Sequence, residues 1–237
     1  MYDPESNSWT GRAPLNKPRR NFGSAVVGST IYAIGGVVEN WEDTDTIEEY
    51  DSLRDVWRII DARLPSPRAC IATVVIDDKI WCIGGSNNTG YLASVDVFDP
   101  ATGRWEEKPP MLTKRNSLGA AFVDGSIIAI GGFDGKTLSV VERFDISAGR
   151  WLRVPREFRP RSNFGICVMD GVVFCAGGMR GTDQIAEVEA LDPSSLVLKP
   201  IDPLRDARGN LMLLSLGGVL FALGGNNKRF FSTLEIW

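Results

Sequence analysis

Five arginines placed at a regular interval are the first residues of this sequence that could do chemistry. Each arginine precedes a Gly-Gly pair by 16 residues, and an acidic residue follows each pair. An arginine beside a carboxylate can bind an anion or a sugar in a catalytic site, or it can form a structural ion pair. The arginines are Arg19, Arg68, Arg115, Arg161 and Arg208, and the acidic residues are Glu48, Asp96, Glu142, Glu189 and Glu235.

We interpret these arginines as structural, because a feature of every repeat serves the repeat, whereas a catalytic site needs one asymmetric cluster. Their expected partners are backbone carbonyls, a neighbouring repeat or the recurring acidic residues. Histidine is absent from the chain, so no side chain titrates near neutral pH with an unperturbed pKa, and the commonest metal ligand is missing. The sequence therefore predicts no catalytic residues, no metal site and no cofactor.

The four cysteines are Cys70, Cys82, Cys167 and Cys175. They lack the density of a secreted disulfide framework, and we expect them to be reduced and buried, as suits the cytoplasm. Cys82 and Cys175 occupy one position of two repeats, where the other repeats have alanine. We interpret these two as small hydrophobic residues.

The size and charge of the chain exclude several classes of protein. It has 237 residues and a net charge of −4, which indicates no attraction to nucleic acid or to anionic membranes. The N-terminus has no basic start followed by an apolar run, so we expect no signal peptide. The most apolar stretch, 211–223, is interrupted by Gly217-Gly218 and is too short to span a bilayer. We expect a single domain over residues 1–237, located in the cytoplasm.

Internal repeats must position these residues. Gly-Gly pairs end an apolar run five times, at intervals of 46 to 49 residues, and each repeat divides into four short strands. In the third repeat the strands are 119–123, 127–130, 139–144 and one centred on Trp151, with Asp124-Gly125 as a two-residue hairpin turn. No window has a sustained helical period, so helix content should be near zero. The pairs are Gly35-Gly36, Gly84-Gly85, Gly131-Gly132, Gly177-Gly178 and Gly224-Gly225.

A second recurring mark is an aromatic-Asp pair with a tryptophan seven residues after the aromatic residue, as in Tyr2 to Trp9. We expect the aspartates to organise turns. In the fourth repeat Leu191 and Leu198 take the places of the aromatic residue and the tryptophan. We therefore expect that repeat to be the least firmly packed at its outer edge. The recurring tryptophans are Trp9, Trp57, Trp105 and Trp151.

The segments Tyr2–Trp9 and Gly131–Phe144 resemble the kelch repeat, especially that of the BTB-kelch substrate adaptors, and the resemblance covers essentially the whole chain. It implies an all-β propeller with five four-stranded blades in this chain. In the repeat frame, residues 1–12 fall on an outer strand and residues 234–237 on a third strand. We expect the N-terminal strand to pair with the C-terminal blade and close the ring. Kelch propellers usually have more blades, so this is either an unusual five-bladed ring or a fragment of a longer protein.

Two sets of loops differ between repeats, one after the recurring arginines and one after the Gly-Gly pairs. By the resemblance, these loops form the substrate-binding face of BTB-kelch proteins. Aromatic side chains among arginine and asparagine are typical of interface hot spots. The candidate partner-binding residues are Arg20, Asn21, Trp41, Asn87, Asn116, Ser117, Phe133, Ser162, Asn163, Arg180, Asn210, Arg229 and Phe230.

The predicted function is that of a protein–protein interaction module rather than an enzyme. By the resemblance it is the substrate-recognition domain of a BTB-kelch adaptor of a cullin ubiquitin ligase. It would bind a protein or peptide on the loop face and reach the cullin ligase through a BTB region absent from this sequence. The alternatives are an actin- or cytoskeleton-binding kelch scaffold and a kelch-fold enzyme acting on sugars.

Overall fold

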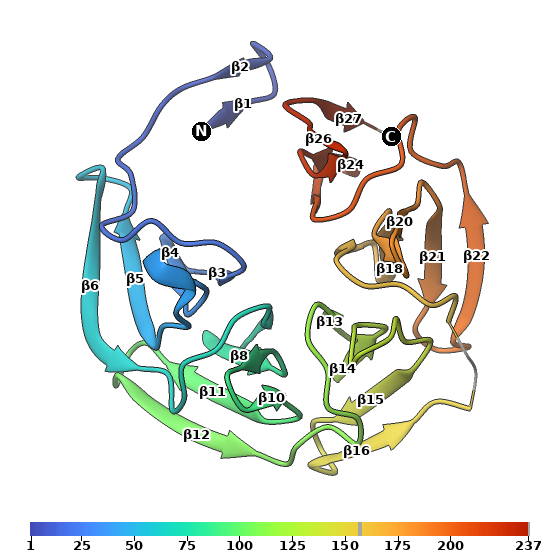
Figure 1. Cartoon of the computed structure of the whole chain (residues 1–237), viewed down its shortest axis with the longest axis horizontal. Helices are drawn as coiled ribbons and strands as arrows, with labels where there is room; N and C mark the ends of the chain where they lie inside the picture. Colours follow the sequence, from blue (N-terminus) through green and yellow to red (C-terminus); the bar gives the residue numbers. More distant parts are fainter. Residues whose placement is uncertain (156–157, 237) are drawn as a thin grey trace.

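Antiparallel β-sheets arranged around a central axis form an incomplete ring (Figure 1). The computed structural model describes residues 1–155 and 158–236. Within these ranges the one helical segment is the short 3-10 turn η1 (Glu39–Trp41). The expectation of an almost purely β protein is therefore confirmed.

Four of the sheets have four strands each and form blades 1 to 4, numbered along the chain. Within a blade the strands follow in chain order, and the first strands of successive blades contact one another around the channel. Blade 1 contains β3 (Gly23–Val27), β4 (Thr30–Ile34), β5 (Thr46–Asp51) and β6 (Val56–Arg63), and blade 2 contains β7 (Ala72–Ile76), β8 (Lys79–Ile83), β11 (Val95–Asp99) and β12 (Arg104–Lys108). Blade 3 contains β13 (Gly119–Val123), β14 (Ser126–Ile130), β15 (Val141–Asp145) and β16 (Arg150–Arg153), and blade 4 contains β17 (Gly165–Met169), β18 (Val172–Ala176), β21 (Val188–Asp192) and β22 (Val197–Ile201).

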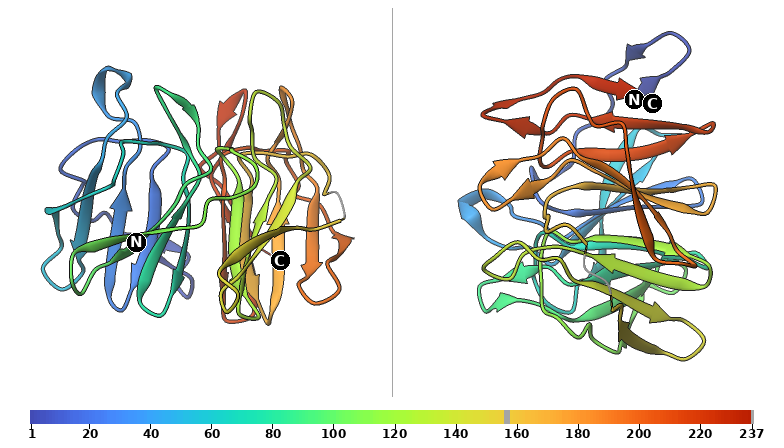
Figure 2. Two further views of the ribbon diagram at one scale, coloured as in Figure 1. Left: turned by 90° about the horizontal axis from the view of Figure 1, so that it is seen from below. Right: turned by 90° about the vertical axis from the view of Figure 1, so that its right-hand side faces the viewer.

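Blade 5 has three strands in the described residues, and short hairpins decorate three of the blades. The hairpins follow the Gly-Gly pairs and lie at one end of the ring, together with η1 (Figure 2). Blade 5 contains β23 (Met212–Leu216), β24 (Val219–Leu223) and β27 (Leu234–Ile236). The hairpins are β9 (Ser86–Asn87) with β10 (Gly90–Tyr91), β19 (Met179–Arg180) with β20 (Asp183–Gln184), and β25 (Asn226–Asn227) with β26 (Arg229–Phe230).

Local sequence explains the geometry of blade 3. Asp124 and Gly125 both have positive φ, 48° and 65°, as a tight two-residue turn between β13 and β14 requires. Asp145 ends β15 and accepts backbone N–H bonds from Ser147 at 2.9 Å and Ala148 at 3.0 Å. These bonds turn the chain into β16, so the aspartate acts as the turn residue that the repeat predicts.

The hydrophobic core lies between blades rather than within one blade. Between blades 2 and 3, Val74, Ile83 and Val97 pack with Ile127 and Phe144, and all five side chains are buried. Burying each such side chain stabilises the fold by about 1.5–3 kcal/mol. Because each sheet packs on its neighbours through both faces, every blade depends on the next one in the ring.

The expected closure of the ring by the N-terminal strand is not formed. β1 (Tyr2–Asp3) pairs with β2 (Ser8–Trp9), and β27 pairs with β24. No pairing among the described residues links β1 or β2 to β27, and Figure 1 shows a gap between them. The reason lies in the repeat frame, since Tyr2 pairs with Trp9 just as Tyr50 pairs with Trp57 in blade 1. β1 therefore occupies the position beside β2 that β27 was expected to take.

One face of blade 5 is left open at this gap. Met212, Leu214, Leu216 and Ile236 on this face are 46–59% exposed. The equivalent residues of blade 2 pack against blade 3 and are 3–8% exposed. This face of blade 5 thus has the apolar residues of a contact between blades, but no blade among the described residues packs against it. The equivalent residues are Ala72, Val74, Ile76 and Val97.

Candidate protein-interaction face

The recurring arginines are buried structural residues. Each side chain is fully buried, and each forms an ion pair with the acidic residue of its own blade. In blade 3, Arg115 Nη1 donates to the carbonyl oxygen of Gly131 at 3.0 Å, and Nη2 lies 3.4 Å from Glu142 Oε1. The pairs are Arg19–Glu48, Arg68–Asp96, Arg115–Glu142, Arg161–Glu189 and Arg208–Glu235.

The backbone at each arginine links consecutive blades. Gly132 N–H of blade 3 donates to the carbonyl of Arg161 at 2.9 Å, and Gly178 N–H of blade 4 donates to that of Arg208 at 2.8 Å. A Cβ atom added to Gly131 would lie 2.4 Å from the Arg161 carbonyl oxygen. Gly131 therefore lies where two neighbouring blades approach too closely for a side chain.

Burial shifts the pKa values of several ionisable groups in the blades. It lowers the pKa of Arg115 to about 10, although Glu142 opposes the shift. Burial likewise raises the pKa of the Cys82 and Cys175 thiols to about 12, far above the range of a reactive thiolate. All four cysteines are free, but Cys70 and Cys167 are only partly buried, which corrects the expectation that all are buried.

The two predicted loop sets meet at one end of the ring. An antiparallel bridge joins the residue after each recurring arginine to the residue after each Gly-Gly pair. This arrangement places both sets on a single surface, which we call the loop face (Figure 2). The bridges are Arg20–Val37, Ala69–Ser86, Asn116–Phe133, Ser162–Met179 and Gly209–Asn226.

Exposed aromatic residues stand on the rim of the loop face. Trp41 in η1 is 79% exposed, and the Arg20 guanidinium carbon lies 3.6 Å from its ring centroid. Phe230 in β26 is 91% exposed. Phe133 packs edge-on against Tyr91 of blade 2, with ring centroids 5.8 Å apart. The rim thus offers apolar anchors beside a cation, the combination that protein interfaces favour.

A series of backbone hydrogen bonds runs from blade to blade along the channel on this face. Cys70 N–H donates to the Asn21 carbonyl at 2.7 Å, and Ser117 N–H donates to that of Cys70 at 3.1 Å. Asn163 N–H donates to the Ser117 carbonyl at 3.0 Å, and Asn210 N–H to that of Asn163 at 2.7 Å. All five residues have positive φ, near 50–55°, a conformation that asparagine tolerates better than most residues.

These five residues line the mouth of the channel, where a pocket of about 290 Å³ opens to solvent. Its other walls are apolar side chains, and no lining residue is charged. A site for acid–base chemistry would need convergent ionisable groups, so this pocket suits recognition of an uncharged or apolar group. The apolar walls are Phe22, Ile71, Leu118, Phe164 and Leu211.

Several other candidate residues are already engaged by neighbouring side chains, and for Asn116 the partner lies in blade 2. Asn116 Nδ2 donates to Ser86 at 2.9 Å, and Asn210 Nδ2 donates to Asn226 at 2.8 Å. Arg180 Nη1 lies 3.1 Å from Glu187, so it is partly neutralised. Ser162 is 3% exposed and is therefore not available to a partner.

Asn87 and Arg229 stand on separate tips of the loop face. The Asn87 side chain accepts a bond from Thr89 Oγ1 at 2.6 Å, and Arg229 is exposed in β26, 5.7 Å from the Phe231 ring centroid. The structure thus brings Asn21, Ser117, Asn163 and Asn210 together at the channel mouth and distributes the rest around the rim.

Sequence reasoning omitted two residues of this face. Cys70 stands two residues after a recurring arginine, as Asn21 does. This register puts it in the loop set after the arginines, but it is not among the candidate partner-binding residues. Tyr91 carries no repeat signal, because it lies in a hairpin specific to blade 2. The described residues contain no group of three or more His, Cys, Asp or Glu side chains that could hold a metal ion.

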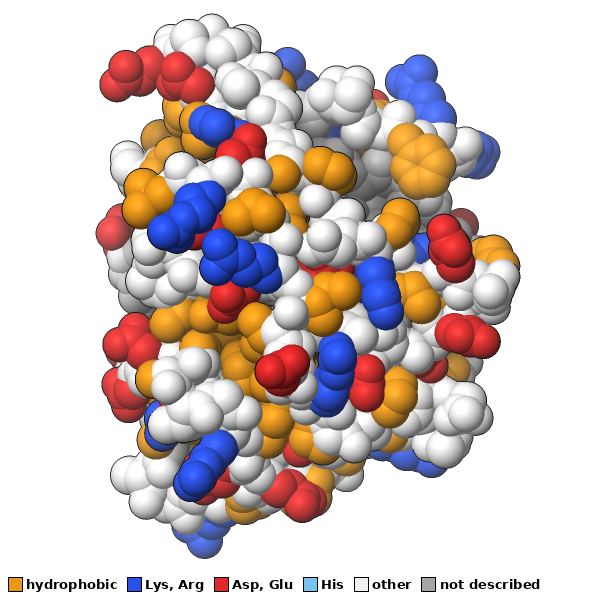
Figure 3. All heavy atoms as spheres, turned by 90° about the vertical axis from the view of Figure 1, so that its left-hand side faces the viewer, with side chains coloured by type: hydrophobic (Ala, Val, Ile, Leu, Met, Phe, Trp, Pro, Cys, Tyr) orange, Lys and Arg blue, Asp and Glu red, His pale blue; other side chains and the backbone are white. Residues whose placement is uncertain are grey.

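The outer surface of blades 1 and 2 carries acidic and basic side chains intermixed with hydrophobic ones (Figure 3). Such mixing is typical of a solvated face. Among the described residues, no helix is long and apolar enough to cross a membrane. The loop face carries the exposed aromatic residues Trp41 and Phe230 and the pocket at the channel mouth.

Comparison with known proteins assigns the family. The KLHDC2/KLHL20/DRC7 Kelch-repeats domain matches residues 1–160, and the Kelch motif matches residues 160–196. Kelch-like protein 35 of Mus musculus is 30% identical over 135 residues, which is 56% of this chain and 22% of that protein. Beta-scruin of Limulus polyphemus is 32% identical over 149 residues, 57% of this chain and 16% of that protein.

Kelch-like protein 28 of Homo sapiens is 32% identical over 98 residues, 39% of this chain and 17% of that protein. The chain thus matches about a fifth of the length of these relatives. The matched repeats carry the Gly-Gly pairs and the buried Arg–acid pairs that build the blades. The chain belongs to the kelch-repeat family, as a β-propeller of the kind found in Kelch-like proteins.

Proposed function

We propose that this chain binds a protein or peptide partner through the loop face. The observation that carries the proposal is the exposure of Trp41 and Phe230 on the loop face, whose channel-mouth pocket has no charged lining residue. Large aromatic side chains and arginine dominate the energetics of many interfaces. Arg20, stacked on Trp41, supplies the cation. Partner binding requires no catalysis. The buried Arg–acid pairs are not accessible to a partner on the loop face.

The finer proposal is that the chain is the substrate-recognition domain of a cytoplasmic BTB-kelch adaptor of a cullin ubiquitin ligase. Its similarity to Kelch-like proteins 35 and 28 supports this role. The cullin contact would come through a BTB region outside this sequence. An actin- or cytoskeleton-binding scaffold is the competing proposal, and co-sedimentation with filaments separates the two.

Affinity capture from cytosolic extract, followed by mass spectrometry, tests the loop face. The variant carries Trp41→Ala and Phe230→Ala, and the matched control carries Leu53→Ala, which removes a side chain that is 94% exposed in a turn of blade 1. We expect the wild type and the control to capture a shared partner that the double variant loses. Equal capture by all three folded proteins would contradict the proposal.

We also propose that these residues belong to one propeller domain whose ring takes a further blade. Three observations support this. The open face of blade 5 is apolar. A Cβ atom added to Gly224 would have the Phe231 carbonyl oxygen, 3.7 Å away, as its nearest neighbour. A Cβ atom added to Gly131 would instead lie 2.4 Å from the Arg161 carbonyl oxygen of the next blade. The hairpin β1–β2 repeats the outer half of a blade.

A further inference from the structure

Blade 4 lacks the aromatic pair that fills the outer edge of the other blades. In blades 1 to 3 a tyrosine or phenylalanine of the third strand packs against a tryptophan of the fourth, with ring centroids 5.0–5.2 Å apart. In blade 4 the same register pairs Leu191 of β21 with Leu198 of β22. Two isobutyl groups therefore stand where the other blades place a phenyl or phenol ring and an indole ring.

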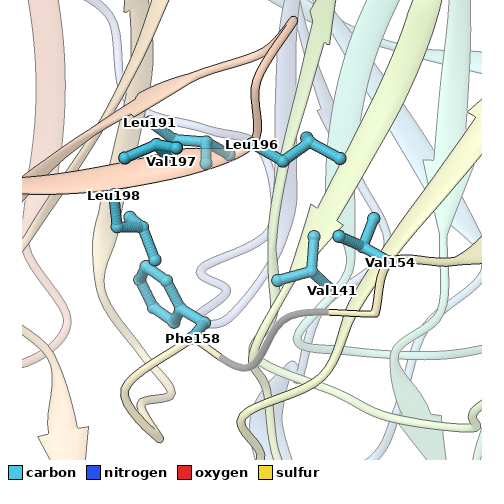
Figure 4. Close-up of a pocket in the computed structure, with 7 residues that line it drawn as sticks. All are labelled: Val141, Val154, Phe158, Leu191, Leu196, Val197 and Leu198. Carbon is cyan, nitrogen blue, oxygen red and sulfur yellow. The ribbon is translucent and has the colours of Figure 1, made fainter.

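A cavity of about 160 Å³ lies at this position, between the outer parts of blades 3 and 4 (Figure 4). Its blade 4 side consists of Leu191 and Leu198 with Leu196 and Val197, which lead into and form β22. On the other side, Figure 4 shows Val141, Val154 and Phe158 facing the same space.

The floor of the cavity is buried and its mouth is close to solvent. Leu191, Val141 and Phe158 are 2–5% exposed, whereas Leu196 and Leu198 are partly exposed. Every lining side chain is apolar, so no side chain is present to hold an ordered water. Apolar cavities of about 150 Å³ remain empty of water and take up a benzene-sized molecule.

The rest of the chain indicates what shape the cavity accepts. In blades 1 and 3 the indole N–H of Trp57 donates to Ala13 O at 3.1 Å, and that of Trp151 donates to Pro109 O at 2.9 Å. Pro155 holds the equivalent position before the recurring arginine of blade 4. The same scaffold, without its tryptophan, thus offers an apolar slot beside the backbone position that accepts the indole N–H in blades 1 and 3.

We propose that this cavity binds a small planar aromatic molecule of about the size of indole. Binding would replace the ring that blade 4 lacks and would bury apolar surface against blades 3 and 4. The site lies at the outer edge of the ring, distant in the fold from the channel mouth. It is therefore independent of the partner proposed for the loop face.

Indole itself is the probe. We expect it to raise the melting temperature of the wild-type chain saturably and to shift the methyl NMR resonances of Leu191 and Leu198. The variant Leu198→Trp fills the cavity from within, so we expect indole affinity at least about tenfold weaker and a higher melting temperature without ligand. The matched control is Leu152→Trp, which adds the same side chain to an exposed position of β16.

The control should bind indole as the wild type does. If Leu198→Trp does not fold, Leu191→Phe takes its place, because it also fills part of the cavity. The proposal is overturned if the wild type shows no saturable response to indole. It is also overturned if a folded cavity-filling variant responds as strongly as the wild type.

Discussion

Arg115 and Glu142 face each other inside blade 3, with Nη2 and Oε1 3.4 Å apart and both side chains fully buried. Glu142 Oε2 also accepts the backbone N–H of Leu112 at 2.8 Å, in the segment that enters the blade. One carboxylate therefore ties the arginine to the connection between blades 2 and 3. The same bridge occurs in blades 1 and 5, where Glu48 and Glu235 accept the backbone N–H groups of Asn16 and Arg205 at 2.8 Å. It gives these carboxylates a role beyond the ion pair, which contributes little net stability by itself.

Truncation of this arginine should strongly destabilise the ring. We expect Arg115→Ala to lower the free energy of unfolding by about 3–5 kcal/mol, because it leaves the Glu142 carboxylate buried and unpaired. Urea denaturation measures the change. The control is Arg150→Ala at an exposed position of β16, expected within about 0.5 kcal/mol of wild type. A loss as small as that of the control would show that Glu142 does not depend on Arg115.

Two glycines with the same backbone conformation should respond differently to alanine. Gly131 and Gly224 have φ of 58° and 62°, so alanine at either costs about 1–2 kcal/mol of backbone strain. Only at Gly131 would the new Cβ meet the next blade, 2.4 Å from Arg161 O. We expect Gly131→Ala to cost about 1–3 kcal/mol more than Gly224→Ala in chemical denaturation. Equal losses of unfolding free energy would mean that the contact between blades 3 and 4 rearranges around the new Cβ atom without destabilising the protein.

Folding stability should fall in acid partly through Asp192. Its carboxylate accepts hydrogen bonds from the Ser194 hydroxyl at 2.7 Å and from the N–H groups of Ser194 and Ser195. These bonds lower the pKa of Asp192 to about 2. Because the folded pKa lies below the unfolded value of about 3.9, the contribution is complete above pH 4 and is lost as the pH falls toward 2.

Asp192→Asn should therefore flatten the dependence of unfolding free energy on pH between about 4 and 2. Ser194→Ala keeps the carboxylate but removes the hydroxyl bond, so its slope should lie between those of wild type and Asp192→Asn. Urea titrations at a series of pH values supply the comparison. Identical slopes for all three proteins would show that this turn does not couple to folding.

The open face of blade 5 should make the chain self-associate. Contiguous exposed apolar patches promote association, and Leu214 lies centrally on β23 with 46% exposure. We expect Leu214→Lys to reduce light scattering and binding of a hydrophobic dye. Leu112→Lys, at a site that is 62% exposed elsewhere, is the control and should change neither. If Leu214→Lys behaves like the control, the face is not a docking surface for a further blade.

Repeat spacing predicted the blades well, because their marks are local. The expected strand 119–123 coincides with β13, and the strand expected at 127–130 begins one residue earlier, at Ser126. The Asp124-Gly125 turn determines both boundaries. The Arg–acid pairs could also be predicted, since charge, spacing and recurrence all point to the same partners.

Features that depend on the curvature of the ring could not be predicted. The backbone bond from Cys70 to Asn21 requires two blades at the right angle, and residue type carries little information about that angle. The closure of the ring by the N-terminal strand was predicted wrongly, because β1 was not recognised as a third strand with Tyr2 opposite Trp9. Exposure of Trp41 and burial of Ser162 likewise follow from tertiary packing, not from loop composition.

The backbone bonds at the channel mouth form an open series with two different ends. Every link has the same direction, so the series ends in the Asn21 amide at one side and the Asn210 carbonyl at the other, and no described residue pairs with either. One end of the series is therefore a hydrogen-bond donor and the other an acceptor. A segment that extended the series would accept from the Asn21 amide at one end and donate to the Asn210 carbonyl at the other.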